Sequence, residues 1–371
     1  MIYLDSGATS FYKPTTVYRA VKCAMDNCAN PGRGGYTAAM TAAKTVLNCR
    51  EQAAELFSCR PEQVVMTSNC THGLNIAINT LVKPGARVVI SGFEHNAVTR
   101  PLHHRQAKIT VAGRRLFDWE NTLETFESAL KRGADVAIFT HVSNVFGYIL
   151  PIEEMAKLCI KYNVPFIVDA AQSAGIADIS MEKLGAAFIA MPGHKGLLGP
   201  QGTGLLLCNT EPAPLLFGGT GSVSVSQEMP EDLPDRLEAG TLNVPGIAGL
   251  GAGIRYIRKQ DCKAILTKET AQVKHCAEGL RDLGMQVFTG DCQAGTLSFL
   301  PHEDPEDFAQ KLAKKGIAVR AGLHCAPTAH QSAGTLQTGT VRVSFGHDAT
   351  SWQTDRFLRA AQACFREKYL Q

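Results

Sequence analysis

Short apolar segments alternate with helix-like segments through the first half of the chain, and this alternation constrains the fold more than any other feature. Strand-like segments lie at 87–92, 134–143, 164–171 and 186–191, and helical spacing of apolar residues recurs at 15–28, 41–58, 72–82 and 151–163. Parallel strands need long crossover connections, so this order favours a buried sheet covered by helices on both faces. We therefore predict an α/β fold with a mainly parallel sheet.

The remainder of the chain predicts a second, smaller unit. Helix-like segments at 246–258 and 264–284 lead to strand-like segments at 296–300, 317–322 and 340–346, with helix-like segments at 305–316 and 349–369. A chain of 371 residues has room for two domains of roughly 100–200 residues each. We interpret 14–250 as the large domain and 251–371, completed by residues 1–13, as a small α+β domain.

Charge and cysteine content exclude several classes of protein. Lys and Arg number 37 against 34 Asp and Glu, which gives no basic excess for binding nucleic acid. No stretch approaches the roughly 18 apolar residues of a membrane span, and no secretory signal is evident at the start. The 12 cysteines lack zinc-ligand spacing. We expect a cytoplasmic protein with reduced thiols and no metal site.

Polar residues directly follow the apolar segments. These are Glu94 and His95, Ser143 and Asn144, the run from Asp169 to Gln172, and His194 with Lys195. Each alone could be an ordinary loop residue, but ligands of parallel sheets bind at the carboxyl ends of the strands. A lysine that forms a Schiff base and a carboxylate that keeps the pyridine nitrogen protonated are what pyridoxal 5'-phosphate (PLP) needs. Together these residues predict a PLP site.

Four longer motifs strengthen this prediction. They are HVSNVFGYILPI at 141–152, VDAAQSAG at 168–175, PGHKGLLGPQGTG at 192–204 and EAGTLNVPGI at 238–247. They resemble the class V aminotransferase family of fold-type I PLP enzymes, and within it the cysteine desulfurase and selenocysteine lyase branch. The resemblance extends from residue 3 to residue 346 and implies that fold, with a large PLP-binding domain and a smaller C-terminal domain.

The resemblance also implies roles for individual residues around the cofactor. Lys195 would form the Schiff base and act as the base for the substrate α-proton, and Asp169 would bind the pyridinium nitrogen. The other implied cofactor contacts are Gln172 to the phenolic oxygen, His95 stacked on the ring, and Cys70, Thr71 and His194 at the phosphate. Thr241 would reach the same phosphate from a second subunit, which implies a homodimer. Pro192 departs from the family, in which serine or threonine is common, and Cys70 stands where threonine is common.

Substrate contacts are implied in the same way. Arg342 would pair with the α-carboxylate through its planar fork, and Asn144 would lie near that carboxylate or the phenolic oxygen. Arg320 and Arg33 are further candidates for substrate binding, and Tyr36 accompanies Arg33 in a glycine-rich segment.

One cysteine calls for a separate interpretation. The segment RAGLHCAPTAH at 320–330 resembles the active-site loop of Suf-type desulfurases, which implies that Cys325 is a catalytic nucleophile. Arg320, His324 and His330 are near in sequence and could lower the pKa of its thiol, whereas Leu323 replaces a residue that is often histidine. A buried structural thiol is the alternative.

We therefore expect a cysteine desulfurase that converts L-cysteine to L-alanine and holds a persulfide on Cys325 for an acceptor protein. A selenocysteine lyase, which acts on L-selenocysteine, remains an alternative, as does an aminotransferase or β-lyase of the same fold. A non-catalytic protein would have no reason to keep Lys195, Asp169 and Arg342 together.

Overall fold

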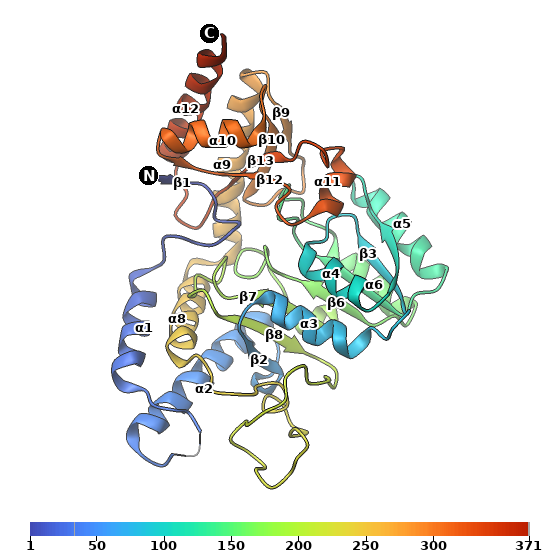
Figure 1. Ribbon diagram of the computed structural model, residues 1–371, viewed down its shortest axis with the longest axis vertical. Coiled ribbons are helices and arrows are strands. Elements are labelled where there is room, and N and C mark those ends of the chain that lie inside the picture. The colour runs from blue at the N-terminus through green and yellow to red at the C-terminus, as the bar shows by residue number, and fades with distance from the viewer. Residues whose placement is uncertain (33, 370–371) are drawn as a thin grey trace.

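The computed structural model describes residues 1–32 and 34–369 and places them in two units around separate cores (Figure 1). The larger unit contains a seven-stranded sheet of order β2-β8-β7-β6-β5-β3-β4. Its strands are β2 (Val64–Thr67), β3 (Arg87–Ser91), β4 (Lys108–Ala112), β5 (Val136–Thr140), β6 (Phe166–Asp169), β7 (Phe188–Pro192) and β8 (Gly204–Cys208). The five strands from β3 to β7 pair in parallel and β8 is antiparallel to both neighbours, so the expected mainly parallel sheet is confirmed.

Helices cover both faces of this sheet because its strands are apolar on both sides. Val89, Phe139 and Val168 point into one core, whereas Ile90 and Ile138 point into the other. The helices of this unit are α1 (Thr15–Asn27), α2 (Thr37–Phe57), α3 (Cys70–Leu81), α4 (Asn96–His104), α5 (Trp119–Lys131), α6 (Ile152–Lys161), α7 (Met181–Leu184) and α8 (Val244–Gln260), with a 3-10 turn at Pro61–Gln63. Helices α3 and α4 pack on one face, and α2, α5, α6 and α8 on the other.

The smaller unit is a four-stranded antiparallel sheet with helices. Its strands β9 (Gln286–Phe288), β10 (Thr296–Leu300), β12 (Arg320–Gly322) and β13 (Thr340–Ser344) have the order β12-β13-β10-β9. Helices α9 (Cys262–Asp282), α10 (Pro305–Lys314) and α12 (Ser351–Tyr369) accompany it, and α11 (Pro327–Ala333) lies toward the large unit (Figure 1).

The strand expected at 317–322 is instead two strands. Its first part, β11 (Ile317–Ala318), pairs in parallel with β1 (Ile2–Tyr3), and its second part is β12, which pairs with β13. The prediction of one strand was wrong because two different partners divide the segment. Ile2 and Leu4 pack in the core of the small unit, so the N-terminal residues join that unit.

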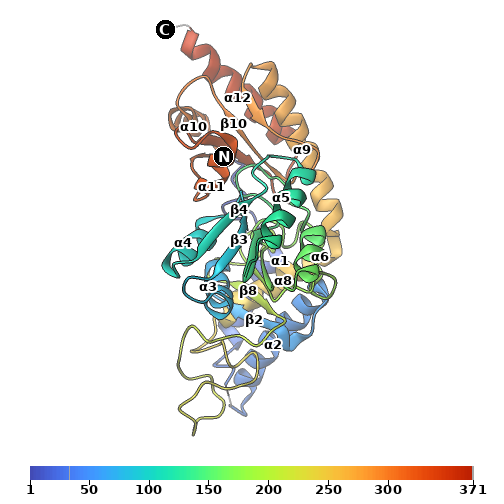
Figure 2. The same cartoon turned by 90° about the vertical axis from the view of Figure 1, so that its right-hand side faces the viewer.

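The boundary expected at residue 250 lies inside α8. Leu250, Ile254 and Ile257 all belong to the core of the large unit, and the chain turns into α9 at Asp261, which has a positive φ of 66°. Residue 250 thus lies within a helix that packs in the core of the large unit, as Ile265 of α9 also does, and the boundary between the two units stays a prediction. Between β8 and α8, residues 209–243 form a long loop without helix or strand that projects from the large unit in both views (Figures 1 and 2).

None of the helices in the described ranges is long and apolar enough to cross a membrane.

Candidate active site

The carboxyl ends of the parallel strands bring the expected residues to one edge of the sheet. β6 ends at Asp169, β7 ends three residues before Lys195, and β3 is followed at once by the turn that contains His95. Glycines on both sides of the His194-Lys195 pair permit this turn, because a side chain at Gly193 would meet the Thr203 hydroxyl and one at Gly196 would meet the Ala174 carbonyl. The tight packing fixes where Lys195 leaves the backbone.

Asp169 and Lys195 form the buried centre of this edge. Asp169 is 2% exposed, and its Oδ1 accepts hydrogen bonds from the Ala171 amide at 2.9 Å and from the Cys70 thiol at 3.4 Å. Burial raises the pKa of Asp169 and lowers that of Lys195, and the opposite charges of the two groups oppose both shifts. A cation beside Asp169 would therefore favour its ionised form.

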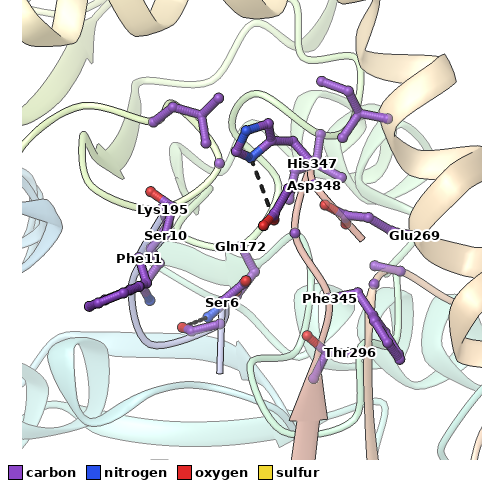
Figure 3. A pocket seen from close by; sticks show the side chains of 18 of the residues that line it. Ser6, Ser10, Phe11, Gln172, Lys195, Glu269, Thr296, Phe345, His347 and Asp348 are labelled. Atoms are coloured by element: carbon purple, nitrogen blue, oxygen red, sulfur yellow. Dashed lines mark hydrogen bonds and ion pairs between the residues drawn. The ribbon is translucent and has the colours of Figure 1, made fainter. Parts of the chain in front are cut away.

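The Lys195 side chain lines a pocket between the two units (Figure 3). Gln172 lines the same pocket, where its Nε2 donates to the Gly7 carbonyl at 2.9 Å. Glu269, from α9, also faces it and is 2% exposed, and its Oε2 has no hydrogen-bond partner among the described residues. Sequence reasoning missed Glu269, because a glutamate within a helical pattern gives no sign that it is buried.

Two histidines flank this centre in neutral form. The ring Nδ1 of His95 accepts from the Ala97 amide at 3.0 Å, which leaves Nε2 to hold the ring proton. His194 Nδ1 lies 3.0 Å from the Thr9 hydroxyl. Burial, with the positive charge of Lys195 as the second cause, lowers the pKa of each to about 4.

The N-terminus of α3 lies at the same edge and presents an anion-binding arrangement. The side chain of Asn69 caps the helix by accepting from the His72 amide at 2.9 Å. The first amides of the helix, those of Cys70 and Thr71, have no acceptor within it, and Thr71 is exposed. The structure therefore places both predicted phosphate ligands at a suitable helix start.

Arg342, on β13, lies deep below the N-terminal segment. It is 2% exposed, its Nη2 pairs with Asp5 Oδ1 at 2.5 Å, and its Nη1 donates to the Asn144 carbonyl at 2.9 Å. Its Nε and the Asn144 Oδ1 are buried and have no hydrogen-bond partner in the part of the chain that the structure describes. Asp5 was not predicted as part of the site. Its only sequence signal was its place in the matching segment near residue 3.

Cys325 is an exposed thiol on the loop between β12 and α11. It lines a second pocket together with His95, Thr71, Arg100 and Leu215. The loop extends from the small unit to the large unit, where the Asn96 amide donates to the Cys325 carbonyl at 2.7 Å. The alternative of a buried structural thiol does not describe this side chain.

The neighbours of Cys325 differ from expectation. His324 and His330 are buried, their rings stack at 5.7 Å, and they bond to the Arg320 carbonyl and the Thr335 hydroxyl. Burial lowers their pKa values to about 2 and about 4. Activation of the Cys325 thiol by the positive charge of these two histidines therefore stays a prediction, and it is one that their burial disfavours. Arg320 is exposed on β12, opposite Arg342.

Two further predicted residues lie on the surface. Thr241 is exposed at the end of the 209–243 loop, Tyr36 is 59% exposed before α2, and Arg33 lies outside the described residues. Pro192 ends β7, where it is paired with Gly204. Leu323 is 39% exposed at the start of the Cys325 loop. Within the described part of the chain, no cluster of His, Cys, Asp and Glu could hold a metal ion.

The family comparison agrees with this geometry. Residues 2–357 match the model of the family described as aminotransferase class-V. The chain belongs to this family. Its fold is accordingly that of fold-type I PLP enzymes. Members of the class V aminotransferase family use PLP as their cofactor.

Relatives within the family share one name. A probable cysteine desulfurase of Methanothermobacter thermautotrophicus is 32% identical over 94% of this chain and 91% of its own length. One of Pyrococcus abyssi is 33% identical over 93% and 89%. The apo structure of the cysteine desulfurase from Thermococcus onnurineus NA1 is 31% identical and superimposes with a TM-score of 0.90 over 99% of this chain and 95% of its own. The expected branch of the family is thus supported by both sequence and structure.

Proposed function

We propose that this chain is a PLP-dependent cysteine desulfurase that converts L-cysteine to L-alanine and receives the sulfur on Cys325. The observation that supports it most is the exposed Cys325 thiol in one pocket with His95, beside the edge that holds Lys195 and Asp169. A PLP site alone fits many reactions, whereas an accessible thiol next to it fits sulfur abstraction. The names of the relatives point the same way.

The residues present fit PLP. A buried carboxylate at Asp169 suits a pyridinium nitrogen, the free amides at the start of α3 suit a phosphate, and the buried amine of Lys195 suits a covalent attachment. Gln172, His95 and His194 would complete the contacts. When bound, the cofactor supplies an electron sink next to the substrate Cα.

The protein groups then have separate tasks. Arg342 would bind the substrate carboxylate. Asn144 Oδ1, which has no partner in the described part of the chain, can only accept, so it would suit a hydrogen-bond donor of the substrate. Burial lowers the pKa of the Lys195 amine, so its neutral form is available to accept and return a proton. The site is closed on one side by the N-terminal segment, whose Gly7 backbone lies against Gln172 and Arg342.

Sulfur transfer is the task of Cys325. Its thiolate sulfur bonds to the substrate sulfur as the substrate Cβ–S bond breaks, and the electron pair stays with the carbon fragment. That fragment takes up a proton and leaves as alanine, while the enzyme keeps a persulfide. An acceptor protein would later remove the sulfur.

The quaternary structure is part of the proposal. Thr241 is exposed, and the loop before it presents Phe217 at 73% and Val225 at 98% exposure, apolar surface that a second copy could cover. We propose a homodimer in which Thr241 reaches the partner's phosphate site. Sedimentation of the holoenzyme should show a dimer, and a monomer would contradict this part. A cytoplasmic location stays a prediction.

The function is tested by alanine formation from L-cysteine and from L-selenocysteine. Lys195→Ala should lose both activities, and Cys325→Ala should lose turnover of cysteine by at least a hundredfold. Full cysteine turnover by Cys325→Ala would instead favour a β-lyase. Selenocysteine lyase is the second candidate, favoured if wild-type turnover of selenocysteine is independent of Cys325 and far exceeds that of cysteine.

A further inference from the structure

The loop that contains Cys325 is held in an unusual backbone conformation. His324 and Cys325 have positive φ values of 50° and 56°, a region that residues other than glycine rarely adopt and then mostly as single residues. The carbonyls of both residues are bound by the large unit. Asn144 Nδ2 donates to the His324 carbonyl at 2.8 Å, and the Asn96 amide donates to the Cys325 carbonyl at 2.7 Å.

Helix α11 is attached to the same part of the large unit by two hydroxyls. Thr328 Oγ1 donates to the Glu94 carbonyl at 2.8 Å, and Ser332 Oγ donates to the Gly92 carbonyl at 2.9 Å. The turn that receives them is rigid, because the buried Glu94 carboxyl accepts from the Ser91 hydroxyl and from the Thr140 amide. This turn leads directly into His95.

From these contacts we propose that Thr328 is a positioning residue for Cys325. Thr328 lies three residues after the cysteine, and its hydroxyl binds the carbonyl of Glu94, the residue before His95. This hydrogen bond therefore connects the loop that contains Cys325 to the turn that contains His95. Together with the Asn96 contact, it opposes the tendency of the left-handed pair to relax. The inference rests on the proposed function and adds a residue that does not touch substrate or cofactor.

Thr328→Val removes the hydroxyl while keeping the shape of the side chain, and Thr328→Ser keeps the hydroxyl. Loss of one such hydrogen bond should lower kcat for L-cysteine about fivefold and leave KM and the absorbance of the bound cofactor unchanged. Hydrogen exchange of backbone amides in 323–330 and at Asn96 should become about fivefold faster in the same variant. The serine variant should behave as wild type in both measurements.

Thr338→Val is the matched control, because this residue is exposed and, among the described residues, its hydroxyl bonds only to the neighbouring Gly339 carbonyl. The inference is overturned if Thr328→Val keeps wild-type kcat or wild-type exchange, or if serine fails to restore both. Hydrogen exchange does not depend on the reaction. A failure of the proposed function, seen as an active Cys325→Ala, is therefore distinguishable from a failure of this inference.

Discussion

At Arg342, the guanidinium is already held before any substrate carboxylate arrives. Asp5 pairs with one of its nitrogens, and the Asn144 carbonyl accepts from another. Burial lowers the pKa of Arg342 and the Asp5 carboxylate opposes that shift, so the aspartate helps to keep the buried group charged. This arrangement fixes the orientation of the fork that we propose for substrate binding.

Arg342→Lys should therefore raise KM for L-cysteine at least tenfold. Lysine keeps the positive charge but lacks the planar pair of donors, so it can satisfy Asp5 or a substrate carboxylate but not hold both in one geometry. Steady-state kinetics would measure the change, and the melting temperature would show whether the variant is folded. A folded variant with unchanged KM would argue against a role for Arg342 in substrate binding.

Most of the candidate site could be predicted at this scale, but its supporting contacts could not. Lys195, Asp169 and His95 follow strands, so a local pattern marks them. Asp5 meets Arg342 across 337 positions in sequence, which no local pattern records. The neutral state of His324 likewise depends on burial against His330, which only the folded loop creates.

Among the elements, strands at the sheet margin were harder to predict than those at its centre. β5 and β6 are wholly buried and read as apolar runs, so they were predicted. β4 is exposed over its first three residues and therefore lacks such a run. β2 and its neighbour β8 were not predicted either, although both are wholly buried and β2 is as long as β6. The helical spacing of apolar residues predicted α9 at nearly its true length, but it did not predict that Glu269 is buried within this helix.

That burial has a consequence for stability. It raises the pKa of Glu269 from its ordinary 4.5 to about 8, with Asp348 adding to the rise. Between these two values the folded state holds a proton that the unfolded state has lost, so stability falls as pH rises from about 4.5 to about 8. Glu269→Gln should remove this slope and gain on the order of 3 kcal/mol over wild type at pH values above about 8.

Chemical denaturation at several pH values would measure the effect. Glu278→Gln, an exposed glutamate on the same helix, is the matched control and should follow wild type. Parallel pH dependence of the Glu269→Gln variant and wild type would show that this carboxyl does not titrate in a buried state.

At the scale of the whole molecule, the proposed chemistry depends on contact between the two units. Lys195 and Asp169 belong to the large unit, whereas Cys325 and Arg342 come from the small unit. The sequence indicated two units, and residue 250, where it set their boundary, lies within α8, whose apolar residues continue in the core of the large unit through position 257. Which loop of one unit would dock on the other could not be predicted, because those hydrogen bonds join residues 180 and 234 positions apart.

The central claim is that sulfur passes to Cys325, and mass spectrometry of the peptide containing it tests this most directly. After the holoenzyme reacts with L-cysteine without reductant, the account predicts one added sulfur atom on Cys325, released by a reducing agent, and no such addition in Lys195→Ala. Alanine formation with no sulfur on Cys325, or with the sulfur on another cysteine such as the exposed Cys23, would contradict it.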